Sequence, residues 1–316
     1  STADDGTFVS RDALYGFQHT VAPVGGAELA MHIDMAERGN IRAVVYRDIT
    51  LGVLVLKTFS LLSGAQLGGQ TTFAGYHAKV VNTGDRMLVF YNTAAKTIAY
   101  GAVNSDGTYS YIGTVSGVSD VQTGPFDACA TGHDNEVLLV HIDDSDADVY
   151  VTTLHSNDST SQDSVALAGT TAVTCFKQTA GVCVALVASC DTGMYSLDAF
   201  IVDDNGDIVD DTNLYANASE MLLKATGAPT STTGCTIYYT IESSTALGTA
   251  GWLHCIGRRT ATLEGGGWLT VGTAQDDWLH GMAMVARPMT ASTEHYLLVA
   301  PDQTTSDQEC YLLVRS

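Results

Sequence analysis

Basic residues and long apolar runs are scarce in this 316-residue sequence, and each scarcity removes a class of partner. Lysine and arginine number only 14 against 35 aspartates and glutamates, so the formal net charge is −21. So acidic a chain is not expected to neutralise nucleic-acid phosphates or to bind an anionic membrane through a basic patch. No apolar run approaches the roughly 18 residues that cross a bilayer. We therefore expect neither nucleic acid nor membrane among its partners.

The sequence also lacks the patterns of a secreted or zinc-binding protein. Residues 1–5 are polar and acidic, with neither the basic start nor the apolar centre of a signal peptide. The seven cysteines include no C-x-x-C pair, which argues against zinc. Their odd number and apolar neighbours favour free thiols without disulfides, and hence assembly in a reducing compartment.

Short apolar runs, rich in β-branched and aromatic residues, recur along the chain roughly every 51 residues. Such composition favours strands, and no window shows a sustained helical period. Each run is preceded by a segment of small residues and followed by a turn rich in Asp, Asn and Gly, which predicts hairpins. The runs are 43–46, 87–91, 137–140, 182–187, 236–241 and 296–299.

Four strands in each unit of about 50 residues is the period of a propeller blade. The sequence therefore predicts an all-β fold, a six-bladed β-propeller of four-stranded blades in a single domain, residues 1–316. The segment Asp5–Ser10 resembles the turn and outer strand Asp106–Tyr111, so residues 1–17 are expected to complete the last blade and close the ring. An open or sandwich all-β fold is the alternative. Blade boundaries are predicted near residues 18, 76, 125, 171, 219 and 279.

Candidate catalytic residues are sparse. Glycosidase propellers place carboxylates on the inner strands, because hydrolysis needs an acid and a second carboxylate. Asp34, Asp127 and Glu220 fall on predicted inner strands and form the candidate set, with solvated or hydrogen-bonded channel residues as the alternative interpretation. His77 and His280 lie at the starts of two such strands, where a polar role is favoured over a metal centre.

One acidic turn resembles a calcium loop in part. Asp203, Asn205 and Asp207 have the first three ligand spacings of an EF-hand, but Ile208 occupies the position of its glycine and Leu214 that of its glutamate. Asn-Gly at 205–206 is a hairpin signal, so we expect a β-turn rather than a calcium site. The Asp cluster at 143–148 is interpreted in the same way. No nucleotide-binding or hydrolase motif is present, and no cofactor is expected.

The repeated unit, cleanest at Arg86–Tyr111, resembles the propeller domains of tailed-phage virion proteins, of the podovirus tail nozzle and tail-tip type. The resemblance lies in composition and not in a motif: Thr, Ser, Ala and Gly are abundant, there are only five prolines, and the cysteines occur without a secretion signal. It implies a structural module without catalytic residues that binds other virion proteins in multiple copies, is assembled in the host cytoplasm and is located in the virion. An extracellular propeller that binds or cleaves glycans is the alternative. The binding surface is expected in hairpin tips and in segments 60–76, 226–234 and 286–294.

Overall fold

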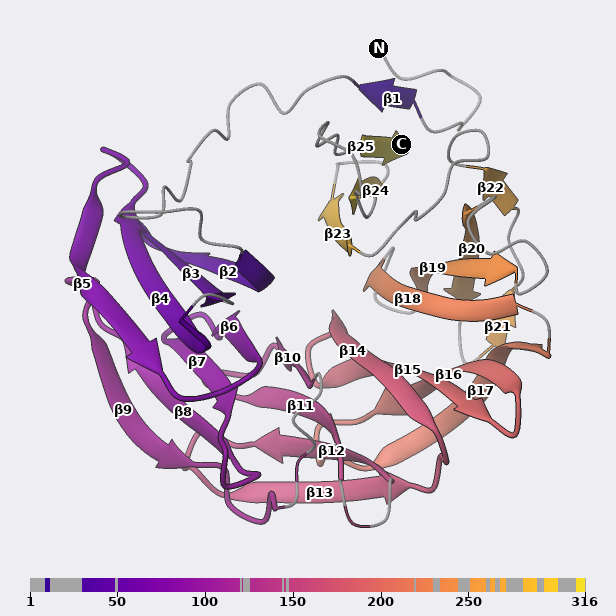
Figure 1. Ribbon diagram of the computed structural model, residues 1–316, viewed down its shortest axis with the longest axis horizontal. Coiled ribbons are helices and arrows are strands. Elements are labelled where there is room, and N and C mark those ends of the chain that lie inside the picture. The colour runs from indigo at the N-terminus through magenta and orange to yellow at the C-terminus, as the bar shows by residue number, and fades with distance from the viewer. Residues whose placement is uncertain are drawn as a thin grey trace. The chain divides into compact units, whose positions relative to one another are not determined.

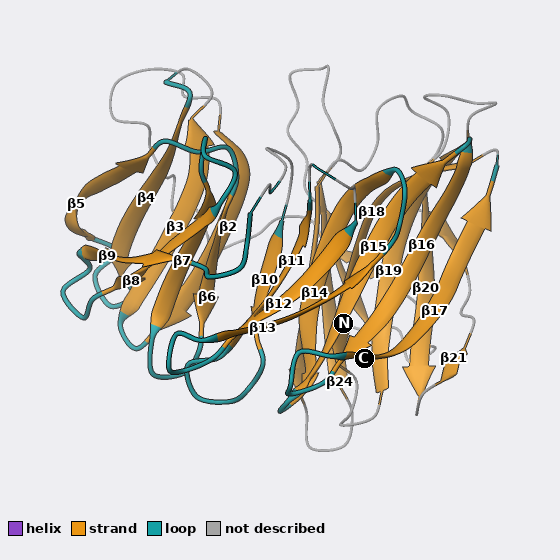
Figure 2. Ribbon diagram, turned by 90° about the horizontal axis from the view of Figure 1, so that it is seen from below, coloured by secondary structure: helices purple, strands orange, loops and turns teal. Residues whose placement is uncertain are grey.

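The computed structural model forms two compact units, which are described separately. The first unit comprises residues 19–167 and 202–208, and the second comprises residues 1–18, 168–201 and 209–316. The structure describes residues 9–11, 30–48, 51–119, 121, 126–143, 145, 148–218, 220–229, 234–243, 251–259, 262–264, 268–270, 281–288, 293–300 and 311–315. Every regular element in these ranges is a β-strand (Figures 1 and 2).

The first unit contains three four-stranded antiparallel sheets, in each of which the strands pair in chain order. The all-β, four-stranded architecture predicted from the repeat is thus confirmed. In Figure 1 the first strands of these sheets lie together and the fourth strands lie at the outside. The strands are β2 (Ala30–Arg38), β3 (Ile41–Asp48), β4 (Val53–Ser60), β5 (Gln66–Phe73), β6 (Ala78–Asn82), β7 (Met87–Asn92), β8 (Ile98–Val103), β9 (Tyr109–Thr114), β10 (Asp127–Ala130), β11 (Val137–Ile142), β12 (Val149–Leu154) and β13 (Thr160–Val165).

The burial of each strand follows from its position in the sheet. The second strands β7 and β11 are almost continuously apolar, and every residue of β11 is buried. In the fourth strands, most residues of β9 are exposed, and half-buried and exposed residues alternate along most of β13. Such patterns are expected for strands with one face in water. Because the middle strands are apolar on both faces, one core forms between the sheets β2–β5 and β6–β9, and another between β6–β9 and β10–β13.

The second unit repeats this plan. Its strands are β14 (Thr170–Thr179), β15 (Val182–Asp191), β16 (Met194–Val202), β17 (Ile208–Asn217), β18 (Glu220–Pro229), β19 (Gly234–Ser243), β20 (Gly251–Arg259), β21 (Thr262–Glu264), β22 (Trp268–Thr270), β23 (Gly281–Pro288), β24 (Thr293–Ala300), β25 (Tyr311–Arg315) and β1 (Val9–Arg11). The sheet that starts at β18 departs from the expected single fourth strand, because β21 and β22 both pair with β20. Gly227 is required by packing, since a Cβ there would overlap the ring of Phe176.

The N-terminal strand pairs with the C-terminal strand. β1 lies antiparallel to β25, with Val9 opposite Val314 and Arg11 opposite Leu312. The sheet β23–β24–β25 therefore takes its fourth strand from the other end of the chain, which is the pairing that the sequence predicts. The edge of β25 is covered by this pairing, as edge strands require.

First strands of successive sheets pack side by side within each unit. β6 lies between β2 and β10 in the first unit, and β18 lies between β14 and β23 in the second. Within each unit, the strands predicted to be the inner ones are thus neighbours of one another. The predicted insertion 60–76 is different: about half of it is the strand β5, because the sheet needs a fourth strand there.

The turns that join third and fourth strands share one geometry. In each turn the N–H of the first residue donates to the carbonyl of the fifth, and the N–H of the fourth residue donates to the carbonyl of the first. The turns are Asn104–Thr108, His155–Ser159 and Asp203–Asp207. Such a turn requires a left-handed fourth residue, which glycine adopts easily. The fourth residues are Gly107 (φ 84°), Asp158 (φ 64°) and Gly206 (φ 85°).

Each of these turns also contacts the third strand of the preceding sheet. All three contacts lie in the first unit, because the turn that contains Gly206 belongs to it. Thr58 Oγ1 donates to Gly107 O at 2.8 Å, Tyr100 Oη donates to Asp158 Oδ1 at 3.0 Å, and Gly206 packs on Thr153, whose Oγ1 would lie 2.9 Å from a Cβ on the glycine. We call these three contacts the turn clasps. They tie neighbouring sheets together at repeating positions.

Candidate functional site

Two of the three predicted carboxylates lie on the row of first strands in the first unit, on the strands to either side of β6. Asp34 lies on β2, Asp127 lies on β10, and Lys79 lies on β6 between them. Lys79 Nζ is 2.8 Å from Asp127 Oδ1, and Asp34 Oδ2 accepts a 2.8 Å hydrogen bond from the backbone N–H of Val80. We call Asp34, Lys79 and Asp127 the Lys79 cluster. Each of these contacts bridges two sheets.

The two carboxylates of the Lys79 cluster have different environments. Burial raises the pKa of Asp34 above its ordinary value, Lys79 opposes this shift, and the charge of Asp127 adds to it. Asp127 is itself buried and ion-paired with Lys79. A carboxyl with a raised pKa beside an ionised carboxylate is the arrangement that an acid catalyst needs. In this cluster, however, one Asp34 oxygen already accepts a hydrogen bond from the backbone of β6, and Asp127 is already ion-paired with Lys79.

Lys79 was not among the candidate residues predicted from the sequence. A signal for it exists, since it is the only lysine, arginine or carboxylate in the predicted inner strand 77–82.

His77 on the same segment is buried, with its ring edge-on to Phe126 at 5.4 Å, which agrees with a packing role. Glu220 begins β18 in the second unit, and its side chain lies outside the described part of the structure. His280 also lies outside the described residues.

The acidic segment at 203–207 is a hydrogen-bonded turn. Asp203 Oδ1 accepts the N–H groups of Asn205 at 2.9 Å and Asp207 at 3.0 Å, and Asp203 Oδ2 accepts the Asn205 amide at 3.3 Å. The carboxylate thus caps the turn, as Asx turns do. Asp143 likewise accepts from Ser145 N–H at 2.6 Å. No cluster of three His, Cys, Asp or Glu residues suited to a metal ion occurs among the described residues.

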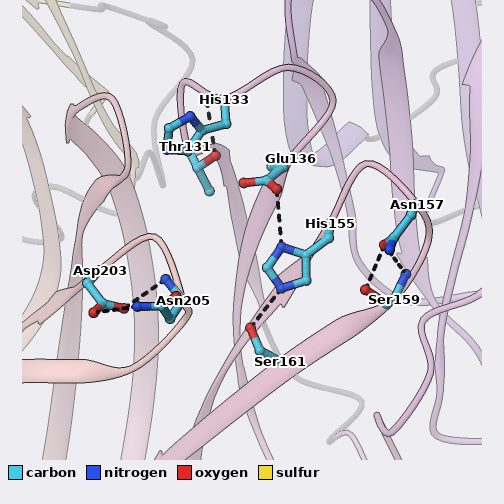
Figure 3. A network of polar contacts seen from close by, with 9 residues as sticks. All are labelled: Thr131, His133, Glu136, His155, Asn157, Ser159, Ser161, Asp203 and Asn205. Atoms are coloured by element: carbon cyan, nitrogen blue, oxygen red, sulfur yellow. Dashed lines mark hydrogen bonds and ion pairs between the residues drawn. The ribbon is translucent and has the colours of Figure 1, made fainter.

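A serine, a histidine and a glutamate form a chain of contacts that sequence analysis did not find (Figure 3). His155 Nε2 lies 3.1 Å from Ser161 Oγ, and His155 Nδ1 lies 3.2 Å from Glu136 Oε1. A nucleophile, a base and an orienting acid have this order in serine hydrolases. Here Gly206 covers the serine, because a Cβ on Gly206 would overlap Ser161 Oγ. An acyl carbonyl would need that space, so the arrangement is better suited to holding the turn than to catalysis.

The cysteines of the described region form no disulfide with one another. They are Cys129, Cys175, Cys183, Cys190 and Cys235, and three of them are buried. The described residues contain no helix that is long and apolar enough to cross a membrane.

Comparison with known proteins identifies the fold. No protein-family model matches the sequence, and a search of curated proteins found no match. Similar solved structures include an arginine-to-alanine triple mutant of AofleA from Arthrobotrys oligospora (TM-score 0.58, 8% identity, 90% of this chain and 82% of that chain). They also include the SapL1 lectin in complex with alpha methyl fucoside (0.53, 16%, 88% and 94%) and the β-propeller domain of the Trilobed protease from Pyrococcus furiosus (0.51, 9%, 90% and 82%). At these identities the likeness concerns the fold alone. The chain is a β-propeller protein.

Proposed function

We propose that this chain is a structural, partner-binding propeller of a tailed-virus particle and has no catalysis of its own. The observation that carries the non-catalytic part is the Lys79 cluster. Its two carboxylates bind Val80 N–H and Lys79, and both contacts join neighbouring sheets. A catalytic pair would instead need carboxylates free to transfer a proton and to stabilise the developing charge. The cluster is therefore explained as a set of links between neighbouring sheets.

The proposed role in a virus particle rests on the resemblance in composition to the propeller domains of tailed-phage virion proteins. The described cysteines form no disulfide with one another, which agrees with assembly in a reducing cytoplasm. The partners in this proposal are other virion proteins, which bind several copies of the chain at its hairpin tips. A net charge of −21 disfavours binding of the packaged nucleic acid itself.

The proposal includes a six-bladed ring. Sheets beginning at β2, β6, β10, β14, β18 and β23 supply the blades, and the pairing of β1 with β25 supplies the closure. Closure by a strand from the opposite terminus leaves no sheet edge open. A closed ring also gives a rigid scaffold on which loops can present a binding surface.

A glycan-binding or glycan-cleaving propeller is the second candidate, and one observation favours it. Asp34 has a raised pKa close to a second carboxylate, Asp127. The similar SapL1 structure contains alpha methyl fucoside, so this fold can hold a sugar.

Co-expression tests the virion proposal. The chain would be produced together with the portal and tail proteins encoded beside its gene, and the mixture separated by size exclusion with light scattering. We expect a complex of fixed stoichiometry that contains several copies of this chain. A chain that elutes alone from every such mixture, or whose gene has no virion genes beside it, would contradict the proposal.

A further inference from the structure

The pair Asn205–Gly206 has a chemistry that its role as a turn does not use. The amide carbon of an asparagine side chain is open to attack by the backbone nitrogen of the next residue. The attack is easiest when that residue is glycine, which has no Cβ to obstruct the approach. The chain has nine asparagines, and only Asn205 is followed by glycine. Asn205 is also exposed, so water reaches its amide.

This reaction is deamidation, and water is the one reactant that it takes up. The Gly206 nitrogen forms a bond to Cγ of Asn205, the Cγ–Nδ2 bond breaks, and ammonia leaves with the proton of the Gly206 amide. The product is a succinimide ring in the backbone. Water then opens the ring at one of its two carbonyls and leaves aspartate or isoaspartate at position 205. Either product adds a negative charge, and isoaspartate also lengthens the backbone.

The folded turn restrains both reacting groups (Figure 3). Gly206 N–H donates to the carbonyl of Asp203 at 3.1 Å, and the Asn205 side-chain amide donates to Asp203 Oδ2 at 3.3 Å. Asp203 Oδ1 accepts the backbone N–H of Asn205 at 2.9 Å. Ring closure needs a nitrogen without its proton and an amide turned toward that nitrogen. The hydrogen bonds at both groups must therefore break before the ring can form.

Packing and charge add to this restraint. Gly206 is buried, and a Cβ on it would overlap Ser161 Oγ and lie 2.9 Å from Thr153 Oγ1, so the glycine cannot shift far while the turn clasp is closed. Asp204 and Asp207 stand on either side of the reacting pair. Nearby negative charge disfavours loss of a proton from the Gly206 amide. Both effects slow the attack in the folded chain.

We infer that Asn205 is a modification site, at which the chain deamidates when the turn clasp at Gly206 opens. In the closed turn, ring formation is suppressed; in the open turn, Asn205 reacts as it does in an unfolded chain. Isoaspartate would not fit the closed turn, whose ends pair through Asp203 N–H and Asp207 O at 3.0 Å. Deamidation would thus make a transient opening of the clasp permanent. The inference goes beyond the proposed function and does not depend on it.

Peptide mass spectrometry on the full chain, incubated at mildly alkaline pH, measures deamidation at each asparagine. We expect Asn205 to react roughly tenfold or more slowly in the folded chain than in the same chain in denaturant, since opening must precede attack. Asp203→Ala removes the carboxylate that caps the turn. Asp204→Ala is the matched control, because it removes the same charge from an exposed neighbour that accepts none of these hydrogen bonds. We expect Asp203→Ala to accelerate the folded-state reaction by roughly fivefold or more and Asp204→Ala by much less.

Each other outcome has a definite meaning. Equal rates in the folded chain and in denaturant would overturn the inference without need of any variant. Faster deamidation in denaturant at another asparagine would overturn the choice of Asn205, and equal rates in the two variants would overturn the control by the turn clasp. The converted chain can be separated by ion exchange through its added charge. We expect faster hydrogen exchange in residues 160–165 of that chain than in the unconverted one, and equal exchange would contradict the loss of the clasp.

Discussion

The Tyr100 hydroxyl in β8 donates a 3.0 Å hydrogen bond to Asp158 Oδ1, in the turn between β12 and β13. Burial, together with the bond to Asp158, raises the pKa of Tyr100 to about 12, so the phenol remains a donor at neutral pH. Asp158 occupies the left-handed turn position with a φ of 64°. This hydrogen bond thus joins the third strand of one sheet to a turn of the next sheet.

Tyr100→Phe should destabilise the protein by about 1–2 kcal/mol, since it removes a hydrogen bond to a charged group and leaves the ring in place. Chemical denaturation measures the free energy of unfolding. Tyr111→Phe is the control, because Tyr111 is exposed on β9 and should change that free energy little. Equal effects of the two substitutions would show that the bond to Asp158 contributes nothing.

Gly206→Ala should destabilise the protein more than Gly193→Ala. Both glycines have a positive φ, 85° and 83°, so both substitutions carry the same backbone cost of about 1 kcal/mol. Only at Gly206 would the added Cβ overlap neighbouring side chains, those of Ser161 and Thr153; nothing lies within 4 Å of a Cβ on Gly193. We expect a further loss of about 1–3 kcal/mol at Gly206. Equal melting temperatures for the two variants would exclude a packed turn clasp.

Asp34→Asn should raise the free energy of unfolding above that of the wild-type protein at neutral pH. At acid pH this gain should be smaller or absent. Burial raises the folded pKa of Asp34, so its favourable contribution is present below the unfolded pKa of 3.8 and is lost as pH rises through the folded pKa. The amide keeps an acceptor for Val80 N–H and removes the buried charge. Asp106→Asn is a contrasting control, because hydrogen bonds from Thr108 lower the pKa of Asp106, so this substitution should lose stability at neutral pH. A loss at neutral pH in Asp34→Asn would mean that attraction to Lys79 outweighs burial.

His141 should make the fold sensitive to acid. Burial lowers the pKa of His141 from 6.5 to about 4, and its Nδ1 has no hydrogen-bond partner among the described residues. Its contribution to stability is complete above the unfolded pKa of 6.5 and is lost as pH falls toward the folded value. The total loss is about 3 kcal/mol. Unfolding free energies from about pH 7 to about pH 4.5 should decline less in His141→Phe, which can keep the stack on Tyr150. Parallel declines would exclude His141 as the cause.

Local patterns were sufficient to predict the strands and hairpins. The apolar run at 87–91 with its Asn-Thr turn became β7, and the run at 137–140 became the fully buried β11. Periodicity and turn residues carry this information because they act within one hairpin. The pairing of β1 with β25 was also predictable, because Asp5–Ser10 repeats the turn and strand at Asp106–Tyr111.

The contacts between sheets could not be predicted in the same way. Thr58 and Gly107 are 49 residues apart, Asp34 and Val80 are 46 apart, and Tyr100 and Asp158 are 58 apart. These separations are close to one repeat, so the repeat indicates which segments meet but not which side chains bond. Lys79 was missed because a single lysine on a strand has no local signature of its partner. The contact of Ser161, His155 and Glu136 was missed because His155 lies in the turn between β12 and β13, whereas Glu136 precedes β11 and is 19 residues away in the sequence.

The most direct test of the central claim is a glycosidase panel, combined with a glycan array, on the purified chain and on its Asp34→Asn and Asp127→Asn variants. Asp106→Asn is the matched control, an exposed carboxylate in a turn. We predict neither sugar binding nor turnover above background for any of the four proteins. Turnover that is lost in Asp34→Asn and Asp127→Asn but retained in Asp106→Asn would contradict the account and identify the Lys79 cluster as a catalytic site.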